Sequence, residues 1–380
     1  MSVSSFGQLQ TIAINARCLN QRMTGVQRFT SEVINAWPKA GRVVAVRTRF
    51  RGVLGHAFEQ LVLPELVGEA TLLSPANAGT LMHRRQIVVI HDIATIDAPE
   101  WFSLAFSMTY RILMPLVART ACMIATVSEF TKARIVCRLG VSPSKIIVVG
   151  NGVEVRPTFL PFERRVKRII FFGSIEPRKN LARLLEAWRR IESADWELVI
   201  AGGRSKLFSE ALLDSRCCRN IRFTGHISDL ELDELLATSR GFVYPSLYEG
   251  FGLPPIEAMG RGCPVVTSVC GAIPEICGRP FTAQSERVHN WSTVRGTPLS
   301  GIAYGFSPGD AVAEGAAIYC DPFSIESISI ALRQLQRLSK QDFDRLVSNG
   351  VERARSFKWS DVAGRLHSMA RSLSVKRNVY

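Results

Sequence analysis

The stretch PSLYEGFGLPPIEAMGRGCPVV, residues 245–266, decides how the rest of the chain is interpreted. An apolar strand is expected just before it, at residues 241–244, and leads into a loop that carries Glu249. The Pro-Pro pair then opens a helix whose first turn is expected to hold Glu257, because proline fits the first turn of a helix. Two such carboxylates can face one cleft and bind sugar hydroxyls, while the free N–H groups of the helix start favour a phosphate. The pattern predicts a sugar-nucleotide site. The plainer alternative is a strand–loop–helix unit with solvated acids.

The same stretch resembles the Glu-x7-Glu signature of the retaining GT-B glycosyltransferases of family GT4, the glycosyl transferases group 1, which include bacterial mannosyltransferases. The resemblance covers nearly the whole chain apart from one insertion, and it is strongest over residues 169–266. It implies two Rossmann-like parallel-sheet domains that face a central cleft, with a C-terminal helix that crosses back to the first domain. The implied parts are an acceptor-side domain at residues 1–160, a nucleotide-sugar-binding domain at 161–355 and the crossover helix at 356–380.

The order of the expected elements agrees with an α/β fold, since short apolar strands alternate with amphipathic helices along the chain. The turn-rich piece at residues 150–165 is the natural boundary between two series of strands. Strands are expected at residues 11–15, 43–47, 87–91, 123–127 and 146–149, and then at 168–172, 197–201, 221–224, 241–244, 264–267 and 317–320.

The segment FFGSIEPRKN, residues 171–180, predicts a strand, a loop and the start of a helix. The resemblance implies that this loop, with Gly173, neutralises the donor diphosphate and that Lys179 is the lysine that does so. The family usually has an arginine directly after the glycine, where this chain has Ser174. Either Arg178 replaces that arginine or the Ser174 hydroxyl contacts the phosphate, and Arg178 can also be an ordinary solvated charge.

The resemblance assigns further donor contacts to the second domain. Glu249 would hold hydroxyls of the transferred sugar, Glu257 would hold the ribose, and Ile227 would lie at the nucleobase edge. The loop between the two glutamates would approach the donor through its backbone, at Gly250, Phe251, Gly252 and Leu253.

Two residues of the first domain are further candidates. Gly25, in the segment TGVQR, occupies the position where the family brings a loop against the donor phosphate. His91 follows a central strand and resembles the histidine that contacts the transferred sugar, so we assign it to catalysis with Lys179 and Glu249. A histidine at a strand end is also often structural, and that alternative stays open.

Composition narrows the classes of partner. The net charge is +14 and leans towards the N-terminal half, which suits a diphosphate substrate or an anionic membrane. The basic residues come without a nucleic-acid-binding motif, so no nucleic-acid partner is expected. Nine scattered cysteines, the absence of an apolar run of about 18 residues and a start without a secretory pattern favour the cytoplasm. Neither a metal nor a cofactor is expected, because the basic loop can take the place of a cation at the diphosphate.

Two segments leave alternatives. Residues 101–120 are apolar but broken by Arg111, Pro115 and Arg119, which favours a buried scaffold helix over a membrane-facing one. About 35 residues at 279–313 have no counterpart in the family, and their glycines and prolines favour a mobile surface loop over an acceptor lid.

The sequence therefore predicts a retaining hexosyltransferase of surface polysaccharide synthesis. The expected donor is GDP-mannose and the expected acceptor a saccharide or a polyprenyl-diphosphate-linked oligosaccharide, with peripheral attachment at the inner face of the plasma membrane. A UDP-sugar epimerase of GT-B fold and a non-catalytic nucleotide-sugar-binding protein are the alternatives.

Overall fold

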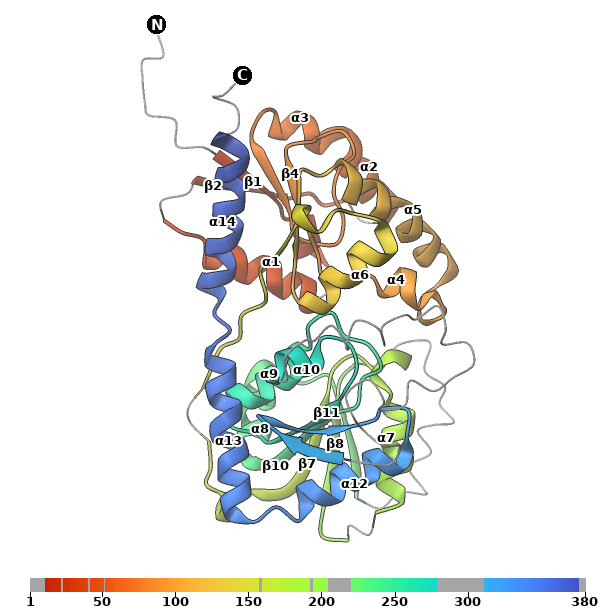
Figure 1. The fold of residues 1–380 in the computed structure, drawn as a ribbon, viewed down its shortest axis with the longest axis vertical. Coiled ribbons are helices and arrows are strands. Elements are labelled where there is room, and N and C mark those ends of the chain that lie inside the picture. Colours follow the sequence, from red (N-terminus) through yellow and green to blue (C-terminus); the bar gives the residue numbers. More distant parts are fainter. Residues whose placement is uncertain are drawn as a thin grey trace, which may run out of the picture. The chain divides into compact units, whose positions relative to one another are not determined.

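The computed structural model describes residues 11–21, 23–39, 42–50, 52–156, 159–191, 194–203, 220–278 and 311–375. The chain divides into two compact units, Val153–Phe357 and a unit formed by Met1–Gly152 together with Lys358–Tyr380 (Figure 1). The piece after residue 152 belongs to the second unit, because Val153 N donates to Phe357 O and Arg156 N to Gly260 O. Helix α14 (Trp359–Val375) returns to the first unit, as expected of the crossover helix.

The first unit contains a six-stranded sheet in the order β2-β1-β3-β4-β5-β6, with every neighbouring pair parallel. Strands β3 and β4 are buried along their whole length, as is usual where helices cover a parallel sheet. The strands are β1 (Thr11–Asn15), β2 (Arg42–Val46), β3 (Thr71–Ser74), β4 (Gln86–Ile90), β5 (Met123–Thr126) and β6 (Ile146–Val148). Strand β3 was not predicted, because four residues without flanking apolar alternation give almost no signal.

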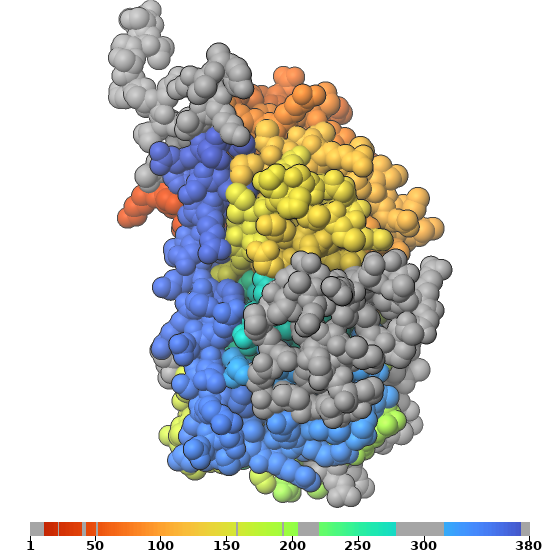
Figure 2. Space-filling model, viewed as in Figure 1, coloured from red at the N-terminus to blue at the C-terminus, as the bar shows by residue number. Residues whose placement is uncertain are grey.

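Helices of the first unit are α1 (Gly25–Asn35), α2 (Gly52–Ala57), α3 (Leu63–Val67), α4 (Ala94–Asp97), α5 (Leu104–Thr120), α6 (Glu129–Leu139) and α14. A π-helical turn, Phe58–Val62, joins α2 to α3. Helix α14 packs against the rest of its unit, because Arg365 on this helix donates to Val148 O and Val149 O. In Figure 2 the blue surface of α14 lies beside the yellow surface of the same unit.

The second unit contains a seven-stranded sheet in the order β12-β13-β11-β10-β7-β8-β9. All pairs are parallel except β12 with β13. The strands are β7 (Val166–Phe172), β8 (Glu197–Ala201), β9 (Ile221–Gly225), β10 (Ser239–Tyr244), β11 (Val265–Ser268), β12 (Ala311–Glu314) and β13 (Ala317–Cys320). The helices include α7 (Leu181–Arg189), α8 (Asp229–Thr238), α9 (Leu253–Gly260), α10 (Ile273–Ile276), α12 (Ile325–Gln336) and α13 (Lys340–Arg355).

The prediction of a buried scaffold helix at residues 101–120 is only half correct. One face of α5 is buried by Met114, Val117 and Ala118, but the opposite face leaves large apolar side chains in solvent. Over the described residues, no helix combines the length and apolar character that crossing a membrane requires. The inserted segment, with its candidates Gln284, His289, Asn290 and Trp291, lies outside the described residues except for its end at β12.

A buried ion pair holds α4 to α6 in the first unit. Asp97 accepts two hydrogen bonds from Arg134, at 2.9 Å from Nε and 2.6 Å from Nη2, and Arg138 Nε lies 3.2 Å from the same carboxylate. The side chains of Asp97 and Arg134 are both almost fully buried. A buried bidentate pair is costly to break, because the remaining charge has no solvent to compensate it.

We expect Asp97→Ala to lower the free energy of unfolding by about 3–5 kcal/mol, since it leaves the Arg134 guanidinium buried without its anion. The matched control is Glu326→Ala, which removes the exposed carboxylate 3.5 Å from Arg333 and should change stability by about 1 kcal/mol or less. Urea denaturation followed by circular dichroism measures both. Equal midpoints for the two variants would contradict a structural role for the Asp97 pair.

Candidate functional site

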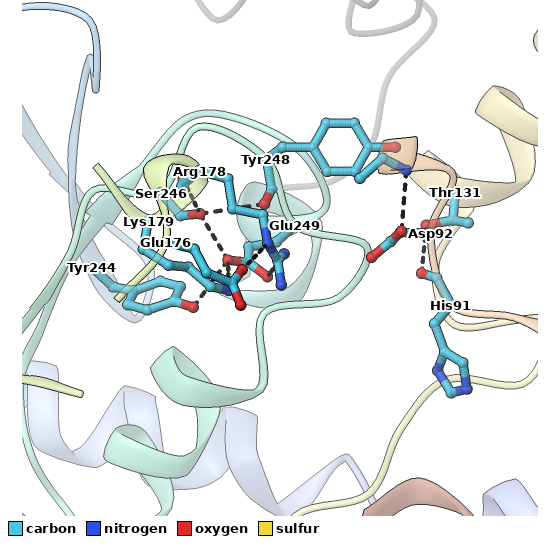
Figure 3. A network of polar contacts seen from close by, with 11 residues as sticks. His91, Asp92, Thr131, Glu176, Arg178, Lys179, Tyr244, Ser246, Tyr248 and Glu249 are labelled. Atoms are coloured by element: carbon cyan, nitrogen blue, oxygen red, sulfur yellow. Dashed lines mark hydrogen bonds and ion pairs between the residues drawn. The ribbon is translucent and has the colours of Figure 1, made fainter. Parts of the chain in front are cut away.

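A buried lysine–glutamate pair lies at the carboxyl edge of the second sheet. Lys179 ends a 3-10 turn, Pro177–Lys179, in the loop after β7, and Glu249 lies in the loop after β10. Strands β7 and β10 are hydrogen-bonded neighbours, so their following loops emerge side by side. Lys179 Nζ lies 2.5 Å from Glu249 Oε1, and both side chains are almost fully buried (Figure 3). Two residues predicted to act together are thus brought into contact.

Glu249 has three further partners, which surround its carboxylate. Tyr244 donates its hydroxyl to Oε1 at 2.9 Å, and Ser246 Oγ lies 2.7 Å from the same oxygen. Arg178 Nη1 lies 3.4 Å from Oε2, while Arg178 Nε is 2.9 Å from Glu176. Arg178 is therefore half-buried and paired, which contradicts the alternative that it is an ordinary solvated charge.

The electrostatics of this cluster follow from burial and from two cations beside one carboxylate. Burial alone would raise the pKa of Glu249, but Lys179 and Arg178 outweigh it and leave that pKa below its ordinary value. Burial and repulsion from Arg178 lower the pKa of Lys179, against the attraction of Glu249. Burial, and then the nearby Glu249, raise the pKa of Tyr244 well above its usual value, so its hydroxyl stays protonated and donates. The cluster thus holds two cations, Lys179 and Arg178, against two carboxylates, Glu249 and Glu176.

Backbone contacts fix the loops that carry these residues. Gly202, after β8, approaches the loop after β7 so closely that a Cβ at this position would lie 1.9 Å from Gly173 O. Asn180, with φ at 62°, follows Lys179 and donates from Nδ2 to Pro245 O at 3.0 Å and to Pro322 O at 2.6 Å. Loops after β7, β10 and β13 are thereby tied together around the buried pair.

The position of Glu257 differs from the prediction. Helix α9 begins at Leu253, so Glu257 is its fifth residue and lies in the second turn instead of the first. The reason is that the residue before α9 is Gly252, with φ at 98°, so the Pro-Pro pair occupies the second and third helical positions. Glu257 is buried and takes no part in the hydrogen bonds that hold Glu249.

The other predicted donor residues lie on the same edge but differ in exposure. Ser174 is exposed in the loop after β7, and Ile227 is half-buried in the loop after β9. Leu253 is half-buried at the first position of α9, and Gly250 is buried. Phe251 packs its ring edge-on against Phe357, with centroids 5.4 Å apart, so its side chain serves the core of the unit.

In the first unit, His91 directly follows β4. Its Nε2 is 2.7 Å from Pro75 O, and its ring lies edge-on to Phe29 with centroids 4.7 Å apart. Burial lowers the pKa of His91, so the ring is neutral near pH 7. A carbonyl oxygen only accepts, so Nε2 carries the proton and Nδ1 is the nitrogen that can accept one from a hydroxyl. Figure 3 also shows the hydrogen bond from Thr131 to the His91 carbonyl oxygen, at 3.4 Å.

Gly25 is the other candidate in this unit, and it is the first residue of α1. It is exposed, and Thr24 before it donates its N–H to Gln27 Oε1 at 3.1 Å. A helix start at this position presents N–H groups without demanding a side chain.

Similarity to known proteins locates the same region. Residues 166–289 match the family model described as glycosyl transferases group 1. This part of the chain is similar to the group 1 glycosyltransferases. The O-antigen chain mannosyltransferase B of Escherichia coli is 29% identical over 219 residues, which cover 52% of this chain and 57% of that protein. The MMP alpha-(1->4)-mannosyltransferase of Mycolicibacterium hassiacum is 37% identical over 171 residues, covering 43% and 40% of the two chains. The chain thus spans about half the length of the curated relatives it matches.

Solved structures resemble the fold of nearly the whole chain. HepE from Anabaena, determined with UDP and glucose, superposes with a TM-score of 0.66 at 14% identity and covers 96% of this chain and 100% of its own. WaaG, a glycosyltransferase involved in lipopolysaccharide biosynthesis, superposes with a TM-score of 0.62 at 15% identity, covering 95% and 99%. These likenesses confirm the predicted GT-B fold with two Rossmann-like domains.

Several members of the cluster were not predicted. Tyr244 and Ser246 lie five and three residues before Glu249, and Glu176 lies two before Arg178. Polar residues of these types are common at strand ends and in loops. In the sequence, only their closeness to Glu249 or Arg178 could have indicated that they belong to the cluster. In the part of the chain that the structure describes, no three His, Cys, Asp or Glu side chains gather closely enough to hold a metal ion.

The lowered pKa of Glu249 predicts a pH dependence of stability. Between its folded pKa and its usual value of 4.5, the unfolded chain binds more protons than the folded one. The stability contributed by the carboxylate is therefore fully present above about pH 4.5 and is lost as the pH falls through the folded pKa. We expect the melting temperatures of wild type and Glu249→Gln to differ most near neutral pH and to converge on acidification. Curves that stay parallel down to about pH 3 would contradict the assigned ionisation.

Proposed function

We propose that this protein is a glycosyltransferase that moves a hexose, mannose from GDP-mannose, with retention of configuration to a saccharide or polyprenyl-diphosphate-linked acceptor in surface polysaccharide synthesis. The observation that carries the proposal is the buried cluster of Lys179, Arg178 and Glu249 at the carboxyl edge of the second sheet. Ligands of open α/β sheets bind at this edge. The cluster also lies inside the region matched to the family, residues 166–289.

The chemistry requires positive charge at the leaving diphosphate. Lys179 and Arg178 would stabilise the negative charge that develops on the diphosphate as the bond between the sugar C1 and the phosphate oxygen breaks. The acceptor oxygen would form its bond to C1 on the same face, and its proton would pass to the departing phosphate oxygen. Glu249 is already surrounded by four donors or cations, so its role would be to orient the sugar hydroxyls and the cations rather than to attack C1.

The identity of the sugar is supported by the names of the two relatives, both of which are mannosyltransferases. The neutral His91, with Nδ1 as an acceptor, is suited to a hydroxyl of the transferred sugar or of the acceptor. A lipid-linked acceptor would bring the protein to a membrane surface, which agrees with a net charge of +14.

The direct test is transfer from radiolabelled nucleotide sugars to a membrane extract that supplies the acceptor. GDP-mannose should give labelled product, and UDP-glucose should give far less. Product should also form in EDTA, because Lys179 and Arg178 supply the positive charge. Release of free or isomerised sugar without acceptor would favour the epimerase alternative, and donor binding without turnover would favour a non-catalytic protein.

Substitutions at the buried pair should slow the chemical step. We expect Lys179→Ala and Glu249→Ala each to reduce kcat/KM by about 10²–10³, because each removes a group that acts on the developing charge. The control is Lys167→Ala on β7, the strand before the Lys179 loop. This exposed lysine lies 3.3 Å from Asp195, and its loss should leave the rate unchanged. Near-normal turnover in either folded site variant would show that the reaction occurs elsewhere.

A further inference from the structure

Helix α5 carries a stripe of large apolar side chains on its solvent side. Leu104, Met108, Ile112 and Leu116 are exposed by 78%, 48%, 61% and 41%. They are spaced four residues apart, so they lie on one face of the helix, one above the other. The helix also has a buried apolar face, so packing within its own unit does not explain the outer stripe. A contiguous exposed apolar face of this kind marks a contact surface.

The charged residues of α5 itself all have one sign. The 17 residues of α5 contain no Asp or Glu, while Arg111 and Arg119 are exposed on the same helix. In the sequence, the first unit has 21 Lys and Arg against nine Asp and Glu, and the second unit has 26 against 24. Twelve of the 14 net positive charges therefore belong to the unit that carries the stripe.

The element beside α5 is apolar on its surface as well. Helix α2 lies next to α5 in Figure 1, and the rings of His56 and Tyr110 contact each other with centroids 6.5 Å apart. Val53 and Leu54 on α2 are exposed. The exposed apolar residues continue along the following turn and α3, at Leu61, Val62 and Leu66.

We propose that the outer stripe of α5, Leu104, Met108, Ile112 and Leu116, docks the protein on an anionic phospholipid surface. An apolar stripe with flanking arginines is the composition of helices that lie in the plane of a membrane interface. At 17 residues, α5 is about 25 Å long, so it can lie on a bilayer. A second copy of the chain is a poor occupant, because two units of charge +12 would repel each other. The proposal deepens the proposed function, since it places the surface that would meet a lipid-linked acceptor.

The experiment is flotation of the full chain with vesicles, without donor or acceptor. Vesicles of phosphatidylcholine with about 30% phosphatidylglycerol are compared with vesicles of phosphatidylcholine alone, at low and high salt. Wild type should bind the anionic vesicles and should bind the neutral vesicles at least tenfold more weakly. Its binding to the anionic vesicles should be weaker at high salt than at low salt. The double variant Met108→Gln with Ile112→Gln should bind the anionic vesicles at least tenfold more weakly, because glutamine keeps the helix but removes the apolar contact. Leu230→Gln, at a residue exposed by 76% on α8 of the second unit, is the matched control and should bind like wild type.

Retained melting temperature and donor binding establish that the double variant is folded. The proposal is overturned if wild type does not bind, if the double variant binds like wild type, or if neutral vesicles bind equally well. It is also overturned if sedimentation shows a wild-type dimer that the double variant abolishes, since a second copy would then cover the stripe. Vesicle binding is measured without sugar transfer, so the two proposals can fail separately. Vesicle binding can be absent while transfer from GDP-mannose to a soluble acceptor occurs, and binding can occur while transfer is absent.

Discussion

The organisation of the second unit depends on one buried charge pair, Lys179 with Glu249. Neither group could remain ionised alone in its position, because the desolvation of an unpaired charge costs several kcal/mol. The pair therefore requires the loops after β7 and β10 to stay together. The hydroxyl groups of Tyr244 and Ser246 supply two further hydrogen bonds to the Glu249 carboxylate. Arg178 adds a second cation beside Glu249, and its Nε is held by the carboxylate of Glu176.

The motif residues could be predicted from the sequence because their spacing ties residue type to strand ends. Lys179 and Glu249 follow strands that were correctly placed, and parallel neighbours bring their ends to one edge. Glu257 was placed in the wrong turn, because the prediction opened the helix at the Pro-Pro pair, whereas α9 begins one residue earlier, at Leu253. Strand β3 was missed for a related reason: four residues, TLLS, become a strand only through their neighbours β1 and β4.

Helix α5 shows a different limit of sequence interpretation. Its residues are apolar around most of the circumference, which is typical both of a fully buried helix and of a helix at a membrane surface. Periodicity alone cannot separate these cases, and the choice of a buried helix was wrong for half of its surface. The deciding information is the position of α5 at the outside of its unit, which comes from the order of the strands and the helices that cover them.

Asn180 places a narrow chemical demand on the chain. Its backbone has a positive φ, which glycine, asparagine and aspartate adopt more readily than other residues, and its side-chain amide donates to carbonyl oxygens of two different loops. Glycine would keep the backbone but supply no donor, and an ionised aspartate would present oxygens to oxygens. Asparagine is thus the residue that satisfies both conditions at once. The relative position of Lys179 and Glu249 can therefore change during evolution only if the loops after β7, β10 and β13 change together.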